Sequence, residues 1–312
     1  MRMAERARAL GIHVRGADVD EGALRRAARL GIEAQHGDVR SPDDMRRLCT
    51  GAELVFHTAA VVEEDGDVDR FRAINVEGTR CVLEAARAAN VRHFLHLSSV
   101  MVYGFDYPRE VDEDGPLRGE GNPYCETKIE SEQIALGFDA PNGMRVVALR
   151  AGDVYGPGSV PWIVRPIGLL QKRLFVLPDG GRGVMNHVYV DNLIDAALAA
   201  MAGDVGGLAL NVTDGENTTF AEFFARLGKM VGRERVPSLP ASSLRIAFAA
   251  IERVARLLRV RPPASAAAVS FVSRPHRVSS ARARRILRWA PSVTLDEGMS
   301  RTEQWLRDEH LA

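Results

Sequence analysis

Residues 12–36 read IHVRGADVDEGALRRAARLGIEAQH, which is a helical stretch between two short strand-like runs. Residues 12–18 and 32–36 have the composition of strands, whereas residues 21–30 carry alanine, leucine and arginine in the pattern of an amphipathic helix. A strand, a helix and a second strand in this order form the building unit of parallel sheets. The stretch therefore predicts an α/β fold.

The same alternation continues along the chain. We expect further strands at residues 53–57, 93–98 and 144–149, and helices that begin at Ser41, at residue 69 and at residue 122. Crossovers between parallel strands are right-handed, so these elements predict a doubly wound parallel sheet.

Beyond residue 151 the pattern changes, because glycine and proline cluster and the remaining elements are mostly helical. The helices expected there are residues 191–201, 220–231, 242–258 and 279–287. We predict two interleaved domains: residues 1–150 with about 185–205, and a smaller, mostly helical one of residues 151–184 and 206–312.

Composition excludes several classes of protein. The 312 residues contain 41 Lys and Arg against 41 Asp and Glu, and this balance leaves no electrostatic footprint for a nucleic acid. No apolar run approaches the ~18–20 residues that span a bilayer, and residues 1–10 lack the apolar core of a signal peptide. We therefore expect a cytoplasmic protein that binds no nucleic acid.

Cysteine and histidine indicate neither a disulfide framework nor a metal centre. Cys49, Cys81 and Cys125 are isolated and odd in number, which fits a reducing compartment. His93 and His96 lie in an expected strand without a third ligand nearby, so we predict no metal.

The beginning of the chain departs from the pattern of a dinucleotide-binding sheet, which starts with a strand, a glycine-rich turn and a helix. Residues 1–11 resemble the last turns of a helix ending on Gly11, so residues 12–18 are expected to form the second strand. Because the first strand is central in the order 3-2-1-4-5-6, its absence would leave two unpaired interior edges. We therefore expect a start site placed too far downstream, with roughly 20–25 residues missing.

The motif that carries chemistry is Tyr124-x-x-x-Lys128, which places a phenol and an ammonium on one face of a helix. A phenol with a pKa near 10 is a poor base at neutral pH, but a nearby cation lowers that pKa. The pair can then relay a proton to or from an alcohol. Alone, the motif is weak, because chance matches are common, and it is more typical of an exposed pair on a surface helix.

Three further fragments accompany this motif. Ser98 and Ser99 end an expected strand, the small residues 58–60 end another, and Asn75 lies in the long helix between them. Each serine alone could simply cap a strand end, so the order of the fragments is what favours a catalytic site.

Together, these fragments resemble the extended short-chain dehydrogenase/reductase family, also called the NAD-dependent epimerase/dehydratase family. The second half is most similar to its 3β-hydroxysteroid and sterol dehydrogenase branch. The resemblance implies a Rossmann-type fold, NAD as cofactor and a homodimer formed through residues 69–90 and 122–136. The matching fragments are residues 37–39 (GDV), 57–60 (HTAA), 75–79 (NVEGT), 98–104 (SSVMVYG), 124–128 (YCETK), 149–158 (LRAGDVYGPG), 187–192 (HVYVDN) and 289–298 (WAPSVTLDEG).

The resemblance also implies roles for single residues. Tyr124 corresponds to the general acid/base, Lys128 to its pKa partner and a donor to the nicotinamide ribose, and Ser99 to the donor that polarises the reacting C–O group. The cofactor-binding residues implied are Asp18, Asp38, Val39, Thr58, Ala59, Ala60, Asn75, Leu97, Ser98, Tyr124, Lys128, Ala151 and Val154. The substrate-binding residues implied are Ser99, Val100, Tyr124 and Asp153.

Asp18 bears on the choice of cofactor. A carboxylate at the end of the second strand accepts hydrogen bonds from the adenine ribose and repels a 2′-phosphate, so NAD is favoured over NADP. The alternative is that Asp18 only caps the helix that starts after Asp20.

Departures from the family pattern bear on the identity of the substrate. Sugar-nucleotide enzymes usually carry an arginine where Met185 and Asn186 stand, although Arg182 lies close by. Residues 242–258 form an amphipathic pattern that fits either a core-packed helix or a helix in contact with lipid.

The function expected from these observations is an NAD-dependent oxidoreductase that interconverts a secondary alcohol and a ketone on an apolar, steroid-like or isoprenoid-like small molecule. The alternatives are a nucleotide-sugar epimerase or dehydratase and, because the glycine loop is absent, a non-catalytic cofactor sensor or scaffold.

Overall fold

The computed structural model describes residues 1–64, 66–107, 109–258, 260 and 265–311. Its central sheet has four parallel strands in the order β11-β6-β4-β3. These strands are β3 (Leu54–His57), β4 (His93–Ser99), β6 (Arg145–Ala151) and β11 (Leu208–Val212). The long apolar runs of β4 and β6 explain their place in the interior of the sheet, because parallel strands are covered on both faces.

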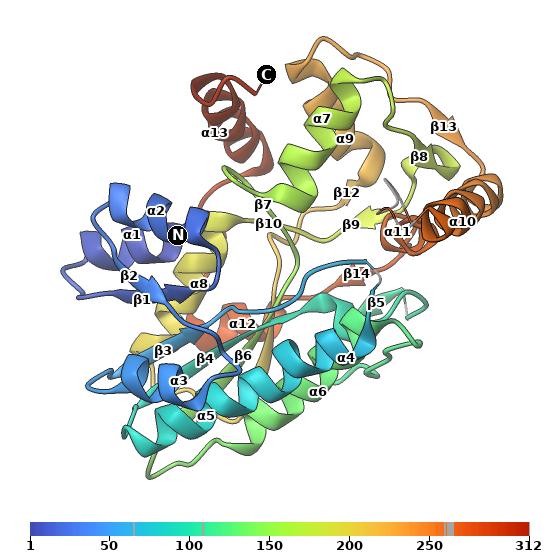
Figure 1. Ribbon diagram of the computed structural model, residues 1–312. Helices are drawn as coiled ribbons and strands as arrows, with labels where there is room; N and C mark the ends of the chain where they lie inside the picture. The colour runs from blue at the N-terminus through green and yellow to red at the C-terminus, as the bar shows by residue number, and fades with distance from the viewer. Residues whose placement is uncertain (65, 108, 259, 261–264, 312) are drawn as a thin grey trace.

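Helices cover both faces of this sheet (Figure 1). One face carries α5 (Gly78–Ala88) and α6 (Pro123–Gly137), and α3 (Pro42–Cys49) packs against α5. The other face carries α8 (Val190–Ala202) and α12 (Ala281–Leu287). The predicted α/β fold with a parallel Rossmann-type sheet is therefore confirmed.

A second, two-stranded sheet is formed by β1 (Arg15–Asp18) and β2 (Glu33–His36), which are joined by α2 (Glu21–Arg29). No strand among the described residues is hydrogen-bonded between β1 and β3, so each of these strands has one unpaired edge. These are the two open edges that the order of elements predicted. Strand β1 is also shorter than expected, and Ile12 before it is 40% exposed.

The helix before β1, α1 (Arg2–Ala9), lies against α8. The Arg2 guanidinium donates to both carboxylate oxygens of Asp191, at 2.7 and 3.0 Å, and Arg6 pairs with Asp195. Gly11 follows the helix with a φ of +79°, a backbone conformation that favours glycine. The predicted helix end at Gly11 is thereby explained.

The long helix expected at residues 69–90 is divided into three segments. They are α4 (Val68–Phe71), a π-helical segment (Arg72–Glu77) and α5. Asn75 lies in the π-helical segment, where its side chain bonds both backbone groups of Val61 and the hydroxyl of Thr127. At Gly78 a Cβ would lie only 2.6 Å from Cγ2 of Val39, so glycine lets α5 pass close to the chain after β2.

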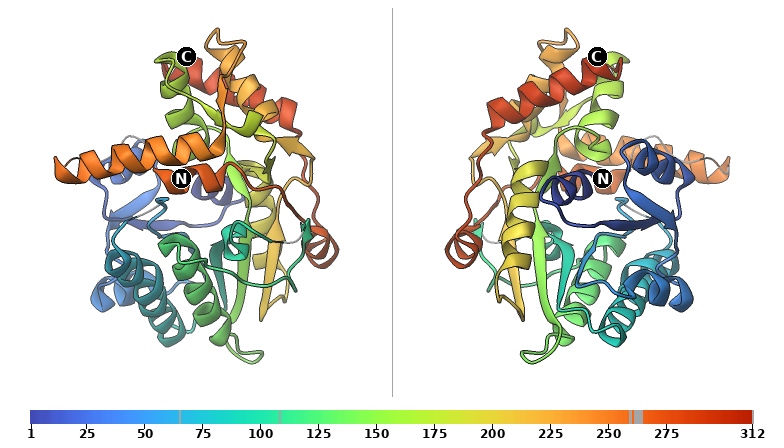
Figure 2. Two further views of the ribbon diagram at one scale, coloured as in Figure 1. Left: turned by 90° about the vertical axis from the view of Figure 1, so that its right-hand side faces the viewer. Right: turned by 90° about the vertical axis from the view of Figure 1, so that its left-hand side faces the viewer.

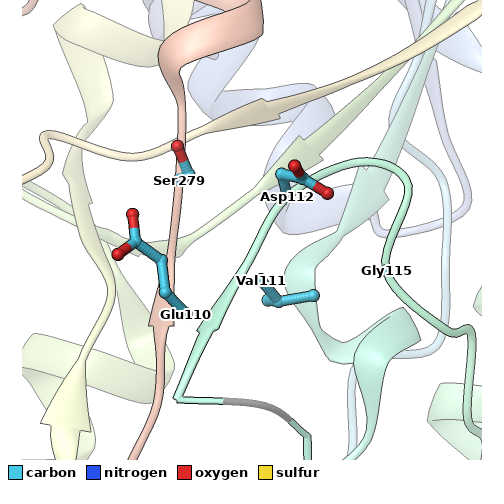
Figure 3. Close-up of a pocket in the computed structure, with 5 residues that line it drawn as sticks. All are labelled: Glu110, Val111, Asp112, Gly115 and Ser279. Carbon is cyan, nitrogen blue, oxygen red and sulfur yellow. The ribbon is translucent and has the colours of Figure 1, made fainter.

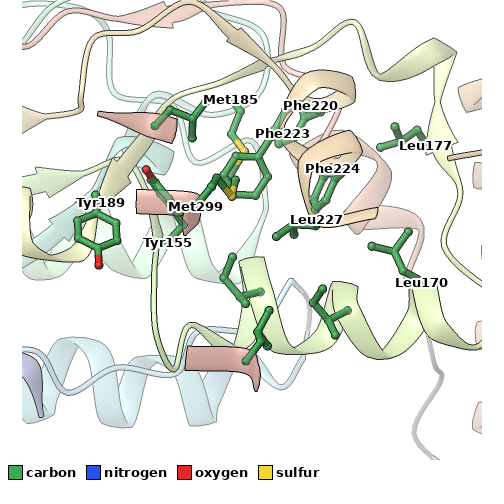
Figure 4. Close-up of a cluster of buried hydrophobic side chains, with 14 of the residues drawn as sticks. Tyr155, Leu170, Leu177, Met185, Tyr189, Phe220, Phe223, Phe224, Leu227 and Met299 are labelled. Atoms are coloured by element: carbon green, nitrogen blue, oxygen red, sulfur yellow. The ribbon is translucent and has the colours of Figure 1, made fainter. Parts of the chain in front are cut away.

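The rest of the chain forms a helical layer beyond the carboxyl edge of the sheet (Figure 1). Its core is an aromatic cluster that includes Tyr155, Phe220, Phe223 and Phe224 (Figure 4). The helices here are α7 (Arg165–Gln171), α9 (Phe220–Met230), α10 (Ala241–Leu257), α11 (Ala266–Phe271) and α13 (Leu295–Asp308).

Short strand pairs connect this layer to the sheet. The parallel pairs are β7 (Asp153–Tyr155) with β10 (His187–Tyr189), β14 (Arg277–Val278) with β5 (Glu110–Val111), and β13 (Ser238–Leu239) with β8 (Leu177–Pro178). The antiparallel pair is β12 (Thr218–Thr219) with β9 (Val184–Met185).

We expected residues 206–312 to belong to the helical domain, but part of this segment lies in the sheet-containing unit. The apolar run LALNV forms β11, which pairs with β6 over five residues, and α12 packs against β11. Residues 208–212 and 281–287 therefore extend the sheet-containing unit rather than the helical layer. No helix among the described residues is long and apolar enough to cross a membrane.

Candidate active site

The site lies where β4 ends and α6 begins. The side chain of Asn122 caps α6 by accepting from the backbone of Tyr124 and Cys125, and Pro123 occupies the first helical turn. This cap fixes Tyr124 one turn before Lys128 on the same helix. Ser99 is the last residue of β4, so the three predicted catalytic residues come together at one edge of the sheet.

Ser99 ends β4 and Tyr124 lies in the first turn of α6, and the Ser99 hydroxyl is close enough to the Tyr124 phenol to act on its pKa. Burial raises the pKa of the Tyr124 phenol to about 12, whereas the nearby Ser99 hydroxyl acts in the opposite direction. The phenol is therefore protonated at neutral pH. A protonated phenol next to a serine hydroxyl can present two donors to a single oxygen atom.

Lys128 is buried and directs its Nζ to the carbonyl oxygen of Leu97, at 2.6 Å. Burial lowers the pKa of Lys128 to about 8, and the carboxylate of Glu132 partly opposes this shift. The cation that lowers the pKa of Tyr124 is instead Arg274. The role of Lys128 as pKa partner of Tyr124 thus stays a prediction.

A buried ion pair lies directly beneath these residues. Nη2 and Nε of Arg150 donate to the carboxylate of Glu132 at 2.6 to 3.1 Å, and both side chains are at most 5% exposed. The Ser98 hydroxyl donates to the same carboxylate at 2.6 Å. The side chain of Ser98 is therefore engaged within the protein interior.

Arg274 and Asp153 form a second buried pair. Nη2 of Arg274 donates to both carboxylate oxygens of Asp153, at 2.9 and 2.8 Å, and the arginine side chain is fully buried. Burial raises the pKa of Asp153, and Arg274 opposes that rise. Asp153, predicted to bind substrate, is thus neutralised by a residue of the helical layer.

Apolar side chains surround Tyr124. Val61 and Met101 pack in one buried cluster with Tyr124, and Phe105 and Phe271 lie against it. The rings of Phe105 and Phe271 meet edge to face with centroids 5.0 Å apart. Because Phe271 ends α11, the helical layer reaches the predicted catalytic tyrosine.

The predicted cofactor residues divide into exposed and interior ones. Asp18 is exposed at the end of β1, and Thr58 and Ala59 are exposed after β3, with Ala60 half-buried. Oδ1 of Asp18 accepts from the backbone N–H of Asp20, at 2.9 Å. The residue that caps α2 is Asp20 and not Asp18.

Other predicted residues contribute to packing. Arg40 binds the carboxylate of Asp38 and lowers its pKa. Those with side chains wholly or partly in apolar clusters are Val39, Leu97, Val100, Ala151 and Val154. Only their backbone atoms or the edges of their side chains are open to a ligand.

Three buried charged residues, Glu132, Arg150 and Arg274, were not predicted from the sequence. Glu132 lies four residues after Lys128, and this spacing was a signal for a shared helix face. Arg150 interrupts an apolar strand, which also marks a paired charge. Arg274 offered no comparable signal, because its partner is 121 residues away.

The positions that bear on a diphosphate site are Met185, Asn186 and Arg182. Met185 is fully buried in the aromatic cluster, and Asn186 bonds the backbone of His276 and Val278. Arg182 is exposed. No group of three potential metal ligands was found among the described residues.

A pocket of about 240 Å³ lies elsewhere, beside the β5–β14 pair (Figure 3). Its lining is formed by Glu110, Val111, Asp112, Gly115 and Ser279. None of the predicted site residues belongs to it, and its acidic lining does not suit an anionic cofactor.

Comparison with known proteins connects this geometry to a family. Residues 2–212 match the model of the NAD dependent epimerase/dehydratase family. The chain belongs to the NAD-dependent epimerase/dehydratase family. Its members include NAD-dependent dehydrogenases and reductases of the extended short-chain type, so the predicted family and enzyme class are confirmed.

Relatives within the family act on different substrates. The chain is 29% identical over 301 residues to a 4-hydroxy-2-methyl-3-oxo-4-farnesyl-3,4-dihydroquinoline-1-oxide ketoreductase of Stigmatella aurantiaca, covering 95% of this chain and 90% of the relative. It is 29% identical over 322 residues to 3beta-hydroxysteroid-dehydrogenase/decarboxylase isoform 1 of Arabidopsis thaliana, covering 93% and 73%. Among solved structures, the UDP-glucose 4-epimerase of Thermotoga maritima has a TM-score of 0.79 at 22% identity, covering 99% and 95%.

The residues of this family member fit the two ends of NAD. The exposed carboxylate of Asp18 at the end of β1 suits an adenosine ribose, and the donors of Tyr124 and Lys128 beside the end of β4 suit the nicotinamide end. No cluster of glycines follows β1 or β3 to hold the pyrophosphate, in the part of the chain that the structure describes.

Asp18→Ala is expected to weaken the preference for NADH over NADPH, because the carboxylate repels a 2′-phosphate. Calorimetric titration of both cofactors into the variant and the parent chain measures the ratio of the two Kd values. Asp20→Ala serves as a control, since it removes the helix cap and leaves Asp18 in place. If the ratio is unchanged in the Asp18 variant, the carboxylate does not face the ribose.

Proposed function

We propose that this chain is an NAD-dependent oxidoreductase that interconverts a ketone and a secondary alcohol on an apolar, steroid-like or isoprenoid-like substrate. The observation that carries the proposal is the placement of the Tyr124 phenol near the Ser99 hydroxyl, within an apolar wall. A substrate carbonyl bound there would meet two hydroxyl donors and otherwise hydrocarbon side chains.

The proton chemistry follows from the state of Tyr124. In ketone reduction, the carbonyl oxygen gains a proton as the carbinol carbon gains a hydride, which NAD in its reduced form supplies when bound. The Tyr124 phenol holds the proton at its hydroxyl, because burial keeps its pKa at about 12. Ser99 donates a second hydrogen bond to the same oxygen and stabilises the developing negative charge. The protonated phenol therefore favours reduction at neutral pH.

Lys128 is proposed to hold the nicotinamide ribose. Its amine is buried and already donates to the Leu97 carbonyl, which leaves two of its three donor positions for ribose hydroxyls. Glu132, one helical turn later, supports the charged form of the amine by raising its pKa.

The electrostatics favour an uncharged substrate. Arg274 is the buried cation that acts on Tyr124, and Asp153 neutralises it through two hydrogen bonds. A diphosphate would have to displace Asp153 from that pair, and a buried carboxylate without its partner is costly. The relative from Stigmatella is named for a farnesyl-bearing ketone and the one from Arabidopsis for a 3β-hydroxysteroid. Both names agree with an apolar substrate.

The experiment that tests this proposal is a comparison of three substrates with the purified chain. A farnesyl-substituted ketone and a 3-ketosteroid are each incubated with NADH, and UDP-glucose is incubated with NAD. We expect NADH consumption with at least one of the two ketones and no conversion of UDP-glucose. Conversion of UDP-glucose alone would assign the chain to the nucleotide-sugar enzymes.

A further inference from the structure

Helix α10 has one face in the protein and one face uncovered. Leu244 and Ala255 are buried, and Leu244 packs with Val269 of α11. On the opposite side, Ile246 is 73% exposed and Leu257 is 83% exposed. Both views of Figure 2 show α10 projecting away from the body of the molecule.

The uncovered side chains form a concentrated apolar surface. Among the described residues, 18 large hydrophobic side chains are exposed, and seven of these lie in or beside α10. We call these seven residues the α10 surface, and they are Leu239, Ile246, Ile251, Val254, Leu257, Leu258 and Val260. Large exposed apolar surfaces of this kind usually mark a contact with a partner or a membrane.

The exposed charged side chains that the structure describes on α10 itself are arginines, and the exposed Asp179 accepts from the backbone N–H of Ala241 at the start of the helix. Residues 241–261 contain five arginines and a single acidic residue, Glu252. Arg245 and Arg253 are exposed, whereas Glu252 is partly buried and accepts from the backbone N–H of Ala266. The outer face of α10 is thus apolar and cationic.

This arrangement disfavours a second copy of the chain as the partner. Arg253 lies seven residues after Ile246 and four before Leu257, so it shares the outermost side of the helix with both. In a twofold contact between two α10 helices, each arginine would approach its counterpart, which is repulsive. An anionic surface with an apolar layer beneath it complements both features.

We propose that α10 docks on an anionic lipid bilayer. Ile246, Val254 and Leu257 would lie in the interface between headgroups and acyl chains, and Arg245 and Arg253 would contact the anionic headgroups. Helices that lie in the membrane plane combine these features, with large apolar residues on one side and arginine beside them.

The docked surface is connected to the candidate site. Helix α11 packs against α10, and its last residue, Phe271, meets Phe105 beside Tyr124. A bilayer at α10 therefore places a source of apolar substrate next to the aromatic pair. This link to the substrate rests on the proposed function, whereas the docking itself does not.

The test is co-sedimentation of the full chain with vesicles, without cofactor or substrate. We expect the chain to pellet with vesicles that contain phosphatidylglycerol and phosphatidylcholine, and to pellet weakly with phosphatidylcholine alone. Ile246→Ser combined with Leu257→Ser is expected to reduce the bound fraction at least tenfold. Arg245→Gln combined with Arg253→Gln is expected to abolish the difference between the two kinds of vesicle.

The matched control replaces exposed apolar residues elsewhere. Val160 and Leu174 are 55% and 65% exposed outside the α10 surface, so Val160→Ser with Leu174→Ser should leave vesicle binding unchanged. All variants change exposed residues, and thermal unfolding verifies that each remains folded. Equal binding by the α10 variant and the parent chain would overturn the proposal. A concentration-dependent dimer that the α10 variant dissociates would also overturn it, and would assign the surface to self-association.

Discussion

Tyr124→Phe is expected to lower kcat for ketone reduction by roughly 10²–10⁴-fold, the usual contribution of a positioned general acid. The variant keeps the aromatic ring in the apolar cluster with Val61 and Met101, so packing is conserved. It removes the phenol hydroxyl that is proposed to give its proton to the substrate oxygen and leaves the Ser99 hydroxyl in place. Steady-state rates with NADH and the reduced ketone measure the loss, and calorimetry should show NADH affinity within a few-fold of the parent chain.

Tyr155→Phe is a matched control for this experiment. The Tyr155 hydroxyl is also buried, but it has no hydrogen-bond partner among the described residues and lies in the aromatic cluster of the helical layer. We expect its activity to stay close to that of the parent chain. If Tyr124→Phe retains most of the activity, the phenol is not the proton donor. The proposed joint action of Ser99 and Tyr124 on the substrate oxygen would then be wrong.

Glu132→Ala is expected to destabilise the fold by about 3–5 kcal/mol, because it leaves the guanidinium of Arg150 buried without a counter-ion. Arg150 is 5% exposed and donates to Glu132 through Nε and Nη2, so solvent cannot replace the carboxylate. The same substitution also removes the acceptor of the Ser98 hydroxyl. Urea unfolding of the parent and the variant measures the difference in the free energy of unfolding.

Two further variants make this experiment decisive. Glu303→Ala breaks an exposed pair with Arg307 on α13 and should cost no more than about 1 kcal/mol. Glu132→Leu combined with Arg150→Met removes both buried charges and should recover much of the stability that Glu132→Ala loses. If Glu132→Ala lowers the free energy of unfolding by no more than Glu303→Ala does, the buried charges are solvated or paired differently.

The sequence predicted β3, β4 and β6 of the central sheet and the helices that begin at Ser41 and Asn122. Local signals were sufficient there, because Ser41 and Asn122 cap helices through their own side chains and β4 is a continuous apolar run. The resemblance then connected Ser99 with Tyr124, and in the structure the Ser99 hydroxyl acts on the pKa of the Tyr124 phenol. The predicted family was confirmed by the match of residues 2–212.

Other features depend on contacts that no local pattern reveals. The neutralisation of Asp153 requires Arg274, which is 121 residues later in the chain. Strand β11 was missed because five residues between glycine-rich turns show no periodicity of their own and become a strand only by pairing with β6. The amphipathic pattern of residues 242–258 was compatible with a core-packed helix or with a helix in contact with lipid. Which face of the helix is uncovered became clear only from the exposure of Ile246 and Leu257 in the structure.

The most direct test of the central claim follows the hydride itself. The purified chain is incubated with a farnesyl-substituted ketone and NADH that carries deuterium at the transferable position, and the product is analysed by mass spectrometry and NMR. We predict one deuterium on the carbinol carbon of a secondary alcohol, with one NADH consumed for each alcohol formed. The account would be contradicted if NADH binds but the ketone is recovered unlabelled, while UDP-glucose is inverted without net consumption of cofactor.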